Sequence, residues 1–558
     1  MVKRLLNFFN REIGGLHDAA YFLGFFAIVS QLLALFRDRL LASMIGPGNA
    51  LDIYYSSFRI PDLIYVSLAS IVSVSVIVPF LAEKIEKNSG DLKKFVDNIF
   101  SFFFLAIALV SVVMFFLMPV IIPKIFFGYD QEKIRQIIEM SRIMLLSPFL
   151  LGLSNFFSSL IQVYRRFILY SLSPLIYSLG IIFGIIFLYP KFGVYGLAWG
   201  VVIGAFFHWA IQVPTVISQG LFPKIKLDLN WTEIRSMVVT AVLRTFTLGI
   251  GQIGTLFLVS MATIIGAGTV SVFSMAYNLQ GVPLTVIGMS YSMAAFPTLS
   301  RLFVAGDTKK FLEEIIISAR HIIFWSMPII ILFIVLRAQI VRTILGAGFF
   351  DWSATRLTAA SLAVFSVSVL AQSLLLLLTR GYYAIGVTKK PLLANLAGLL
   401  LMFVFGMLGH YAFSHYQFVQ NFTEALLRVA DIQGTGVLML ALAYSLAMIS
   451  GTAILLWWFE RDFSGFWPGI KDTFFQSFSA AIIMGFVSYL GLNFFDDIFS
   501  LGSTFGVFAQ GACAGILGLI VWFIILKLLK NQEINEVWRT IHHKIWKSDA
   551  IIPESNEL

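Results

Sequence analysis

Long apolar runs separated by short polar segments occupy almost the whole chain. A helix of about 20 apolar residues crosses the hydrocarbon core of a bilayer, so each run predicts one transmembrane helix. The pattern therefore predicts an all-α polytopic membrane protein of about fourteen transmembrane helices. The predicted spans are 17–43, 53–82, 96–123, 137–163, 168–189, 194–217, 236–265, 270–300, 312–344, 357–385, 391–413, 436–459, 473–495 and 501–526.

Basic residues gather in alternate loops between these runs. The basic loops hold Lys84, Lys87, Lys93 and Lys94, then Arg165 and Arg166, Lys224 and Lys226, Lys309 and Lys310, Lys389 and Lys390, and Arg461 and Lys471. The remaining loops are poorer in positive charge, and one of them carries Asp496 and Asp497. Because cytoplasmic loops collect Lys and Arg, we expect the basic loops and both termini to face the cytoplasm.

A weak internal repeat indicates two halves of six helices. SPLIYSLGIIFGIIF, which begins at Ser173, aligns with KPLLANLAGLLLMFV, which begins at Lys390, and shorter matches precede and follow it. The second copy carries an insertion around residues 414–433. Copies in the same orientation are related by an axis along the membrane normal, with a substrate site expected between them. The predicted parts are an N-terminal lobe (1–220), a C-terminal lobe (221–465), two further helices (466–530) and a basic cytoplasmic tail (531–558), amphipathic at its start and expected at the membrane surface.

Composition excludes several other classes of protein. Charged residues make up only 12% of the chain, against about 25% in soluble domains. The net charge of +9 lies in short loops, so topology explains it and a nucleic-acid partner is not expected. Cys513 is the single cysteine and the histidines are scattered, so we expect no disulfide, metal site or cofactor. No GxxxxGK[ST], HExxH or GxSxG motif is present, which argues against an ATP-driven pump or a hydrolase.

Charged side chains cluster in and just after the first predicted helix. The cluster consists of Arg37, Asp38, Arg39, Asp52, Arg59 and Asp62. Ionisable groups at membrane depth are costly and usually face a cavity or a partner. We expect Arg37 to meet Asp52 across the Gly46–Gly48 turn. The cluster is either a cationic wall for an anionic headgroup or a structural ion-pair network, and we assign Arg39 and Asp62 to the structural role.

Arg244 lies inside the seventh predicted span with no acidic residue nearby. Its guanidinium either points into a polar cavity or snorkels to the cytoplasmic surface. Gln252 on the same helix is a weaker candidate for lining that cavity.

Ordered motifs along nearly the whole chain resemble those of the bacterial lipid II flippases (the MurJ family, formerly MviN). They are LLALFRDRLLASMIGPGNALDIYYSSFRIPDLIY from Leu32, VYRRFILYSLSPLIYS from Val163, GLAWGVVIGAFFHWAIQVP from Gly196, FPTLSRL from Phe296, LGAGFFD from Leu345 and RGYYAIGVTKKP from Arg380. The resemblance implies two six-helix bundles around a central cavity, with two C-terminal helices forming a groove for a lipid tail.

The same resemblance implies a function. A flippase of this family moves an undecaprenyl-pyrophosphate-linked peptidoglycan precursor across the bacterial inner membrane by alternating access, for cell-wall synthesis. Its expected partners are this anionic lipid, membrane lipids and cell-wall synthesis proteins, and the sequence does not indicate a coupling ion. An exporter of another lipid-linked oligosaccharide or of drugs, and a transport-inactive scaffold for envelope assembly, remain as alternatives.

Arg37, Asp52 and Arg59 match charged or basic positions of the family. Elsewhere the chain departs from the pattern: Gln31, Tyr65 and Asn278 stand where the family has Arg, Ser70 replaces a Glu, and Val387 replaces an acidic residue. The loss of guanidinium groups weakens pyrophosphate binding, and Arg244 is the candidate to compensate. The predicted substrate-binding residues are Arg37, Asp52, Arg59, Arg244, Asn278, Gln31 and Gln252.

Overall fold

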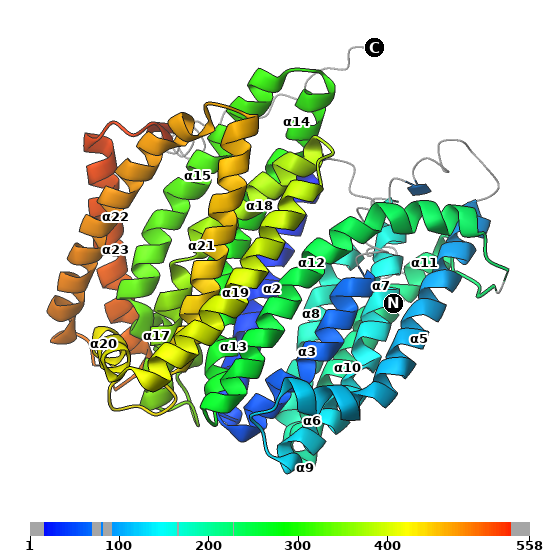
Figure 1. Ribbon diagram of the computed structural model, residues 1–558, viewed down its shortest axis with the longest axis horizontal. Coiled ribbons are helices and arrows are strands. Elements are labelled where there is room, and N and C mark those ends of the chain that lie inside the picture. The colour runs from blue at the N-terminus through cyan, green and yellow to red at the C-terminus, as the bar shows by residue number, and fades with distance from the viewer. Residues whose placement is uncertain are drawn as a thin grey trace, which may run out of the picture. The chain divides into compact units, whose positions relative to one another are not determined.

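The computed structural model describes residues 16–69, 77, 80–81, 92–163, 167–226, 228–500 and 502–536. The regular elements in these ranges are helices (Figure 1). The first part of the chain contains α2 (Leu16–Met44), α3 (Asn49–Ala69), α5 (Leu92–Ile125), α6 (Gln131–Met144), α7 (Leu146–Val163), α8 (Phe167–Phe183), the π-helix η1 (Gly184–Leu188), α9 (Tyr189–Phe192), α10 (Val194–Ala210) and α11 (Val213–Ser218).

The later part contains α12 (Trp231–Ile265), α13 (Thr269–Pro283), the π-helix η2 (Leu284–Met289), α14 (Ser290–Val304), α15 (Thr308–Val335), α16 (Arg337–Leu345), α17 (Trp352–Ser366), α18 (Val369–Ala384), α19 (Lys389–His415), α20 (Gln417–Leu427), α21 (Val437–Asp462), α22 (Phe466–Asp496) and α23 (Thr504–Leu528).

The helices agree with the predicted class of fold. In the part of the chain that the structure describes, 11 helices are long and apolar enough to cross a membrane, or 12 if α17 and α18, bent by 42°, form one span. The predicted total of fourteen is not confirmed. The first two predicted spans correspond to α2 and α3, and most of the second beyond Ala69 lies outside the described residues.

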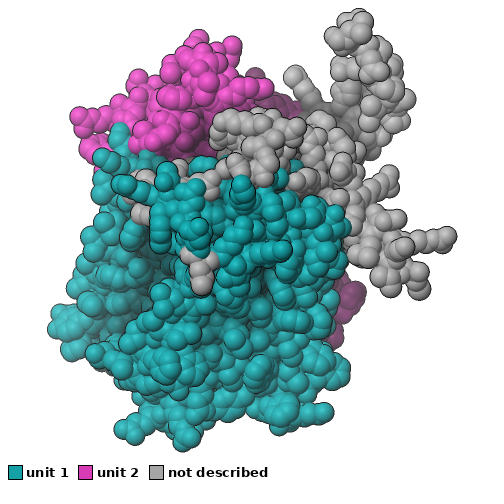
Figure 2. Space-filling model, turned by 90° about the vertical axis from the view of Figure 1, so that its right-hand side faces the viewer, with its two compact units in different colours: residues 1–282, 341–365, 388–451 teal, residues 283–340, 366–387, 452–558 magenta. Residues whose placement is uncertain are grey.

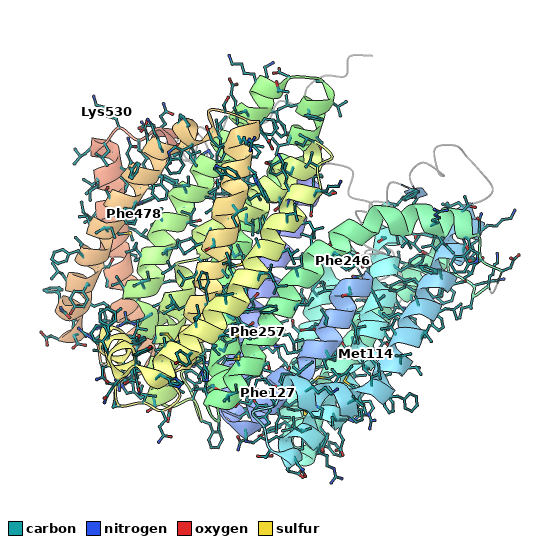
Figure 3. The ribbon with its side chains drawn as sticks, in the orientation of Figure 1. Met114, Phe127, Phe246, Phe257, Phe478 and Lys530 are labelled. Atoms are coloured by element: carbon teal, nitrogen blue, oxygen red, sulfur yellow. The ribbon has the colours of Figure 1, made fainter. Side chains whose placement is uncertain are left out.

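Large apolar side chains cover much of the helix surface. Phe116 on α5 is 69% exposed and Phe246 on α12 is 64% exposed, and Phe478 on α22 is also exposed (Figure 3). A water-soluble protein rarely exposes so many large apolar residues over contiguous surface. Exposed Phe side chains on long apolar helices are typical of a surface that faces lipid.

Glycine allows close packing between helices in both halves of the chain. A Cβ on Gly180 of α8 would lie 2.2 Å from the Gly204 Cα of α10, and one on Gly184 would lie 2.5 Å from the Gly200 Cα. Gly184 is the first residue of η1, so the α8–η1 segment and α10 both carry glycine every fourth residue along their contact. Small residues at this spacing let helix backbones approach in a membrane. In the second half, α19 and α21 also meet at glycine, through Gly398 and Gly451.

The chain forms two compact units, which Figure 2 colours separately. Unit 1 comprises residues 1–282, 341–365 and 388–451, and unit 2 comprises residues 283–340, 366–387 and 452–558. The predicted division at residues 220 and 465 partitions the chain differently and stays a prediction. The contacts described below lie within one unit each.

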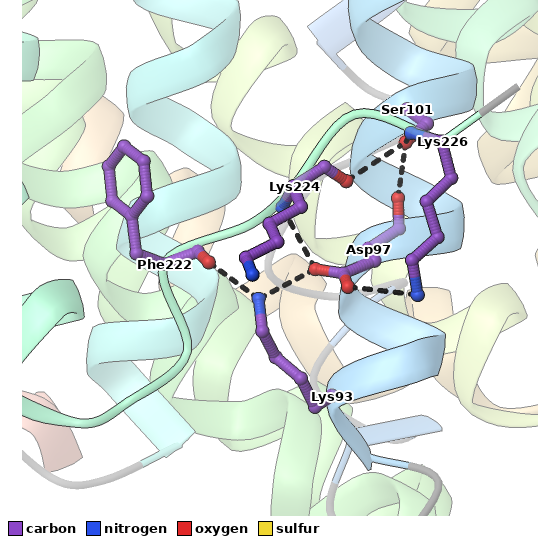
Figure 4. A network of polar contacts seen from close by, with 6 residues as sticks. All are labelled: Lys93, Asp97, Ser101, Phe222, Lys224 and Lys226. Atoms are coloured by element: carbon purple, nitrogen blue, oxygen red, sulfur yellow. Dashed lines mark hydrogen bonds and ion pairs between the residues drawn. The ribbon is translucent and has the colours of Figure 1, made fainter.

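A polar network in unit 1 fixes the segment that leads into α12 (Figure 4). The buried Asp97 carboxylate on α5 accepts hydrogen bonds from Lys93 Nζ at 2.6 Å and from the Lys224 backbone N–H at 2.9 Å. Lys226 Nζ lies 3.1 Å from the same carboxylate, and the Lys226 N–H donates to Ser101 Oγ. Lys224 and Lys226, two of the loop lysines used to predict topology, therefore also bind their loop to α5.

In unit 2, α22 and α23 pack against each other, and the start of the predicted tail docks beside them. Asn531 donates to Gln476, and Thr473 donates to the buried Glu533 carboxylate at 2.9 Å. Residues 537–558 lie outside the described residues, so the predicted surface position of the remaining tail stays a prediction.

Candidate functional site

One face of α13 carries a stripe of polar side chains. Ser271, Ser274 and Asn278 are spaced by three and four residues, which places them on one side of the helix. Each binds a charged residue of α2 or α3, within unit 1. Asp52 and Arg59 are spaced by seven residues on α3, so they share a face as well. The candidate site is the set of contacts between these polar faces.

Asp52 caps the N-terminus of α13. Its buried carboxylate accepts hydrogen bonds from the Gly268 N–H at 2.6 Å, the Ser271 N–H at 2.8 Å and Ser271 Oγ at 2.5 Å. The first N–H groups of a helix have no partner within the helix, and a carboxylate there also faces the positive end of the helix dipole. The predicted pairing of Asp52 with Arg37 is therefore wrong, because α13 supplies the partners of Asp52.

Arg37 instead forms an ion pair with its neighbour Asp38. The Arg37 Nη2 lies 2.8 Å from Asp38 Oδ1, and Arg37 Nε donates to the same oxygen at 3.0 Å. The other oxygen of the buried Asp38 carboxylate accepts a hydrogen bond from Asn278 Nδ2 at 3.2 Å. Asp38 thus joins α2 to α13, and the Arg37 side chain keeps 22% of its surface exposed.

Arg59 binds the middle of the α13 stripe. Its Nη2 donates to Ser274 Oγ at 3.0 Å, and Asp62 lies one turn further along α3. Within the part of the chain that the structure describes, the buried Arg59 Nε has no hydrogen-bond partner. A buried donor without a partner is costly, so this guanidinium is equipped to take a further acceptor.

Beside Arg59, Asp62 and Tyr65 line a small pocket together with Ser147 of α7. Tyr65 stands at a position where the resembling family has Arg, and its hydroxyl accepts a hydrogen bond from Asn155 at 2.9 Å. The rest of the lining, which includes Phe58 and Met144, is apolar, so this pocket at the end of α3 offers a few polar groups in a mostly apolar wall.

Arg39 binds backbone carbonyls at the end of another helix. Its Nη1 donates to the backbone carbonyls of Thr343 and Ile344, at 2.5 and 3.2 Å. These are among the last carbonyls of α16, which lack partners within their own helix. The contact agrees with the structural role expected for Arg39 and separates it from Arg37, which is only two residues away.

Turns from distant parts of the chain interlock at one end of unit 1. A Cβ on Gly348 would lie 2.1 Å from the Ser43 carbonyl oxygen, and the Phe349 N–H donates to that carbonyl. A Cβ on Gly46 would meet the Phe349 carbonyl at 2.8 Å, and Gly268 lies against Pro47. All three turns belong to the loops that are poorer in Lys and Arg, which the predicted topology puts on the non-cytoplasmic side. The contacts of Asp52 with α13 lie at this closed end.

The other predicted site residues lie elsewhere or are not described. Gln31 and Gln252 are partly exposed on α2 and α12, and neither joins the α13 contacts in the part of the chain that the structure describes. Arg244 belongs to α12, and its side chain lies outside the described residues, as does Ser70. Among the described residues, no three His, Cys, Asp or Glu side chains form a group that could hold a metal ion.

Sequence reasoning missed Ser271 and Ser274. Their spacing with Asn278 along TVSVFSMAYN is a polar stripe at helical period inside an apolar span, and this signal identifies them. Asp38 was noted only as a member of the charged cluster, yet it is the residue that links Arg37 to Asn278.

Comparisons with known proteins agree with this architecture. The family model described as Lipid II flippase MurJ matches residues 41–509. A probable lipid II flippase MurJ of Rhizobium tropici is 22% identical over 535 residues, which covers 92% of this chain and 94% of the relative. The lipid II flippase MurJ of Burkholderia cenocepacia is 24% identical over 375 residues, which covers 66% of this chain and 73% of that protein.

Solved structures share the fold. A lipid II flippase MurJ in an inward closed conformation superposes with a TM-score of 0.71 at 22% identity, covering 91% of this chain and 99% of the other. An inward-facing multidrug resistance transporter of the MATE family, in the MOP superfamily, gives a TM-score of 0.64 at 16% identity, with 78% and 95% covered. The fold is thus that of transporters with a membrane-embedded helix bundle.

Proposed function

We propose that this chain, which belongs to the lipid II flippase MurJ family, moves lipid II from the inner to the outer leaflet of the bacterial inner membrane by alternating access. The observation that carries the proposal is the family match over residues 41–509, which includes Asp52, Arg59 and the polar stripe of α13. The chain is a multi-pass membrane protein of transporter fold.

In this proposal, guanidinium groups bind the pyrophosphate of the substrate. Arg37 has exposed surface beside its ion pair, and Arg59 has a free Nε among the described contacts. A planar guanidinium binds phosphate oxygens two at a time, and a second charge-assisted bond adds to both affinity and orientation. Arg244 is proposed as a third such group, while Asn278, Gln31 and Gln252 supply uncharged hydrogen-bonding groups.

Asp52 has a different proposed role. Its three hydrogen bonds to the start of α13 hold the interlocked end closed while the headgroup enters from the cytoplasmic side. Opening that end requires these bonds to break, and the N-terminal N–H groups of α13 then need other acceptors. Asp52 therefore acts on the conformational equilibrium, and it does not bind the anionic headgroup directly, since like charges repel.

The proposed orientation follows from the basic loops, with both termini in the cytoplasm. The proposal needs no cofactor and leaves the coupling ion open. A membrane potential, negative inside, is a suitable energy source, because it favours the outward movement of an anionic headgroup. Cell-wall synthesis proteins are the proposed protein partners of such a flippase.

Complementation tests the proposal. A bacterium depleted of its own lipid II flippase should regain growth and normal shape when it expresses this chain. The Arg39→Lys variant, which keeps the charge near the Thr343 carbonyl, serves as a matched control and should also rescue growth. A chain that reaches the membrane in normal amounts but fails to restore lipid II translocation would refute the proposed substrate.

The alternative roles find less support. The exporters of the MATE family share the fold at 16% identity, and fold alone does not specify substrate. A cationic drug favours buried carboxylates, whereas Asp38 and Asp52 are already engaged by Arg37 and α13.

A further inference from the structure

The short helix α20 lies outside the repeat that relates the two halves. In the first half, a single residue, Gly193, joins α9 to α10. At the corresponding place in the second half, residues 416–436 connect α19 to α21, and α20 forms within them. Since one residue suffices for the connection, these additional residues have a separate role.

Polar contacts bind α20 to the segment that follows it, and Arg356 binds the end of α20 and that segment to α17. The buried Glu424 carboxylate accepts hydrogen bonds from Thr435 Oγ1 at 2.6 Å and from Gln420 at 3.0 Å. Beyond the helix, the Arg356 guanidinium binds both Asp431 carboxylate oxygens, at 2.7 and 2.6 Å, and also the Arg428 carbonyl. Bidentate Arg–carboxylate pairs impose a defined geometry, so α20 has a fixed position on the protein.

The outer face of α20 is apolar and exposed. Phe418, Phe422 and Leu426 follow one another at intervals of four residues and are 78%, 57% and 64% exposed. The Phe418 and Phe422 rings stack with centroids 6.0 Å apart. Glu424 is the single charged residue between Gln417 and Leu427, and it is buried on the inner face, so the outer face carries no charge. In water, such a contiguous apolar patch would be unfavourable, because each large side chain gains about 1.5–3 kcal/mol when it is fully buried.

The exposed stripe continues the lipid-facing surface of α19, one of the long apolar helices. Along α19, Leu400, Val404, Met407, Leu408 and Tyr411 are all about half exposed or more. The stripe reaches Tyr411, one turn before α19 ends at His415, and the Tyr411 ring lies against that of Tyr416, the residue before α20. Figure 1 shows α20 nearly end-on, whereas α19 is seen along its length. The chain thus changes direction at Tyr411 and Tyr416, so that α20 runs across the direction of the spanning helix α19.

We propose that α20 is an interfacial helix, whose Phe418, Phe422 and Leu426 insert into the bilayer on the side opposite Lys389 and Lys390. Amphipathic helices lie in the interface with the apolar face buried about 5–10 Å below the headgroups. Tyrosine side chains such as Tyr411 and Tyr416 favour this depth, because their rings are apolar and their hydroxyls polar. The exposed face has no basic residue, so apolar burial drives the insertion without anionic lipid.

The turn after α20 connects this lipid contact to the closed end of unit 1. A Cβ on Gly434 would lie 3.0 Å from the Thr269 side chain, and Gly436 lies against Ile265. Thr269 is the first residue of α13, and the residue before it, Gly268, donates its N–H to Asp52. Through this packing, α20 supports the same turn that Asp52 holds.

Spin-label depth measurements test the proposal on the full chain. A Cys513→Ser background carries one new cysteine at Phe418, Phe422 or, as a matched control on the polar edge of α20, Gln417. Each labelled protein is placed in nanodiscs of a zwitterionic phosphatidylcholine. Labels at 418 and 422 should collide several-fold more often with lipid-soluble oxygen than with a water-soluble nickel chelate, relative to the label at 417.

Two results would overturn the proposal. Preferential collision of the 418 and 422 labels with the nickel chelate would place this face in water. Protection of both labels from oxygen and from the chelate would mean that a second copy or another protein chain covers the face. Since either single variant can fail to fold, Leu426→Cys provides the same measurement at a third position of the stripe.

Discussion

Asn278 donates a 3.2 Å hydrogen bond to the Asp38 carboxylate, and the other oxygen of that carboxylate holds Arg37. The resembling family has Arg at the Asn278 position. In this chain, the amide therefore shares the acceptor of a guanidinium and brings no charge of its own. Replacing Asn278 with Arg would restore the positive charge that the family carries at this position of α13.

The Asn278→Arg variant should bind a pyrophosphate-bearing lipid more tightly. The new guanidinium can pair with Asp38 and leave Arg37 free for the substrate, so the site gains one charge. A charge-assisted hydrogen bond contributes about 1.5–3 kcal/mol, which corresponds to roughly 10- to 150-fold in affinity. Titration of the lipid against the protein in nanodiscs measures this change, and Asn278→Gln is the control that adds length without charge.

Arg244→Ala should weaken the same binding by a similar factor if Arg244 points into the cavity. Adding Asn278→Arg should then restore part of the loss, because either side chain brings positive charge to one site. The double variant is compared with both single variants in the same titration. Unchanged affinity in a folded Arg244→Ala protein would mean that Arg244 snorkels to the membrane surface.

Arg37→Ala and Arg39→Ala should differ in what they impair. Loss of Arg37 should lower lipid binding roughly 10-fold or more. Loss of Arg39 leaves the Thr343 and Ile344 carbonyls without their donor and should mainly lower thermal stability. Binding titrations and melting temperatures of both variants separate the effects. Equal loss of binding in the two proteins would indicate that the charged cluster is only structural.

Asp52→Ala should open the interlocked end. The substitution removes the acceptor of the Gly268 and Ser271 N–H groups, and each buried donor left without a partner costs about 1–3 kcal/mol. A cysteine placed at Thr269, which is 1% exposed, should then react faster with a membrane-impermeant maleimide in Cys513→Ser protein. The Ser271→Ala variant keeps both backbone donors paired with Asp52 and should show a smaller increase. No change in labelling would remove the proposed closing role of Asp52.

Gly348→Ala should destabilise the interlocked end more than Gly220→Ala. Both glycines have positive φ, 53° and 69°, so both alanines carry a conformational cost of about 1–2 kcal/mol. Only at position 348 would the Cβ also clash with the Ser43 carbonyl, while no atom lies within 4 Å of a Cβ at 220. Melting temperatures and maleimide labelling at Thr269 provide the comparison. Similar melting temperatures and labelling rates for the two variants would show that the clash with the Ser43 carbonyl does not destabilise the interlocked turns.

The class of fold and most helix positions could be predicted from the sequence alone. An apolar run is a local property, and in a bilayer its length determines whether it can span, so α12 and α19 match the predicted spans 236–265 and 391–413 closely. The ordered motifs likewise pointed to the family that the comparisons show. The different roles of Arg37 and Arg39 could be anticipated because they cannot share one face of a helix.

The partners of the charged residues were decided only by tertiary structure. Arg37 and Asp52 are 15 positions apart in sequence, and proximity suggested that they pair. The structure instead brings Asp52 to Gly268 and Ser271, more than 200 positions away, because the start of α13 has unpaired N–H groups that need an acceptor. Hydropathy identifies which segments enter the membrane, but it does not predict which helix ends are in contact. That choice depends on the packing of whole helices, where glycines such as Gly46 and Gly348 allow backbones to touch.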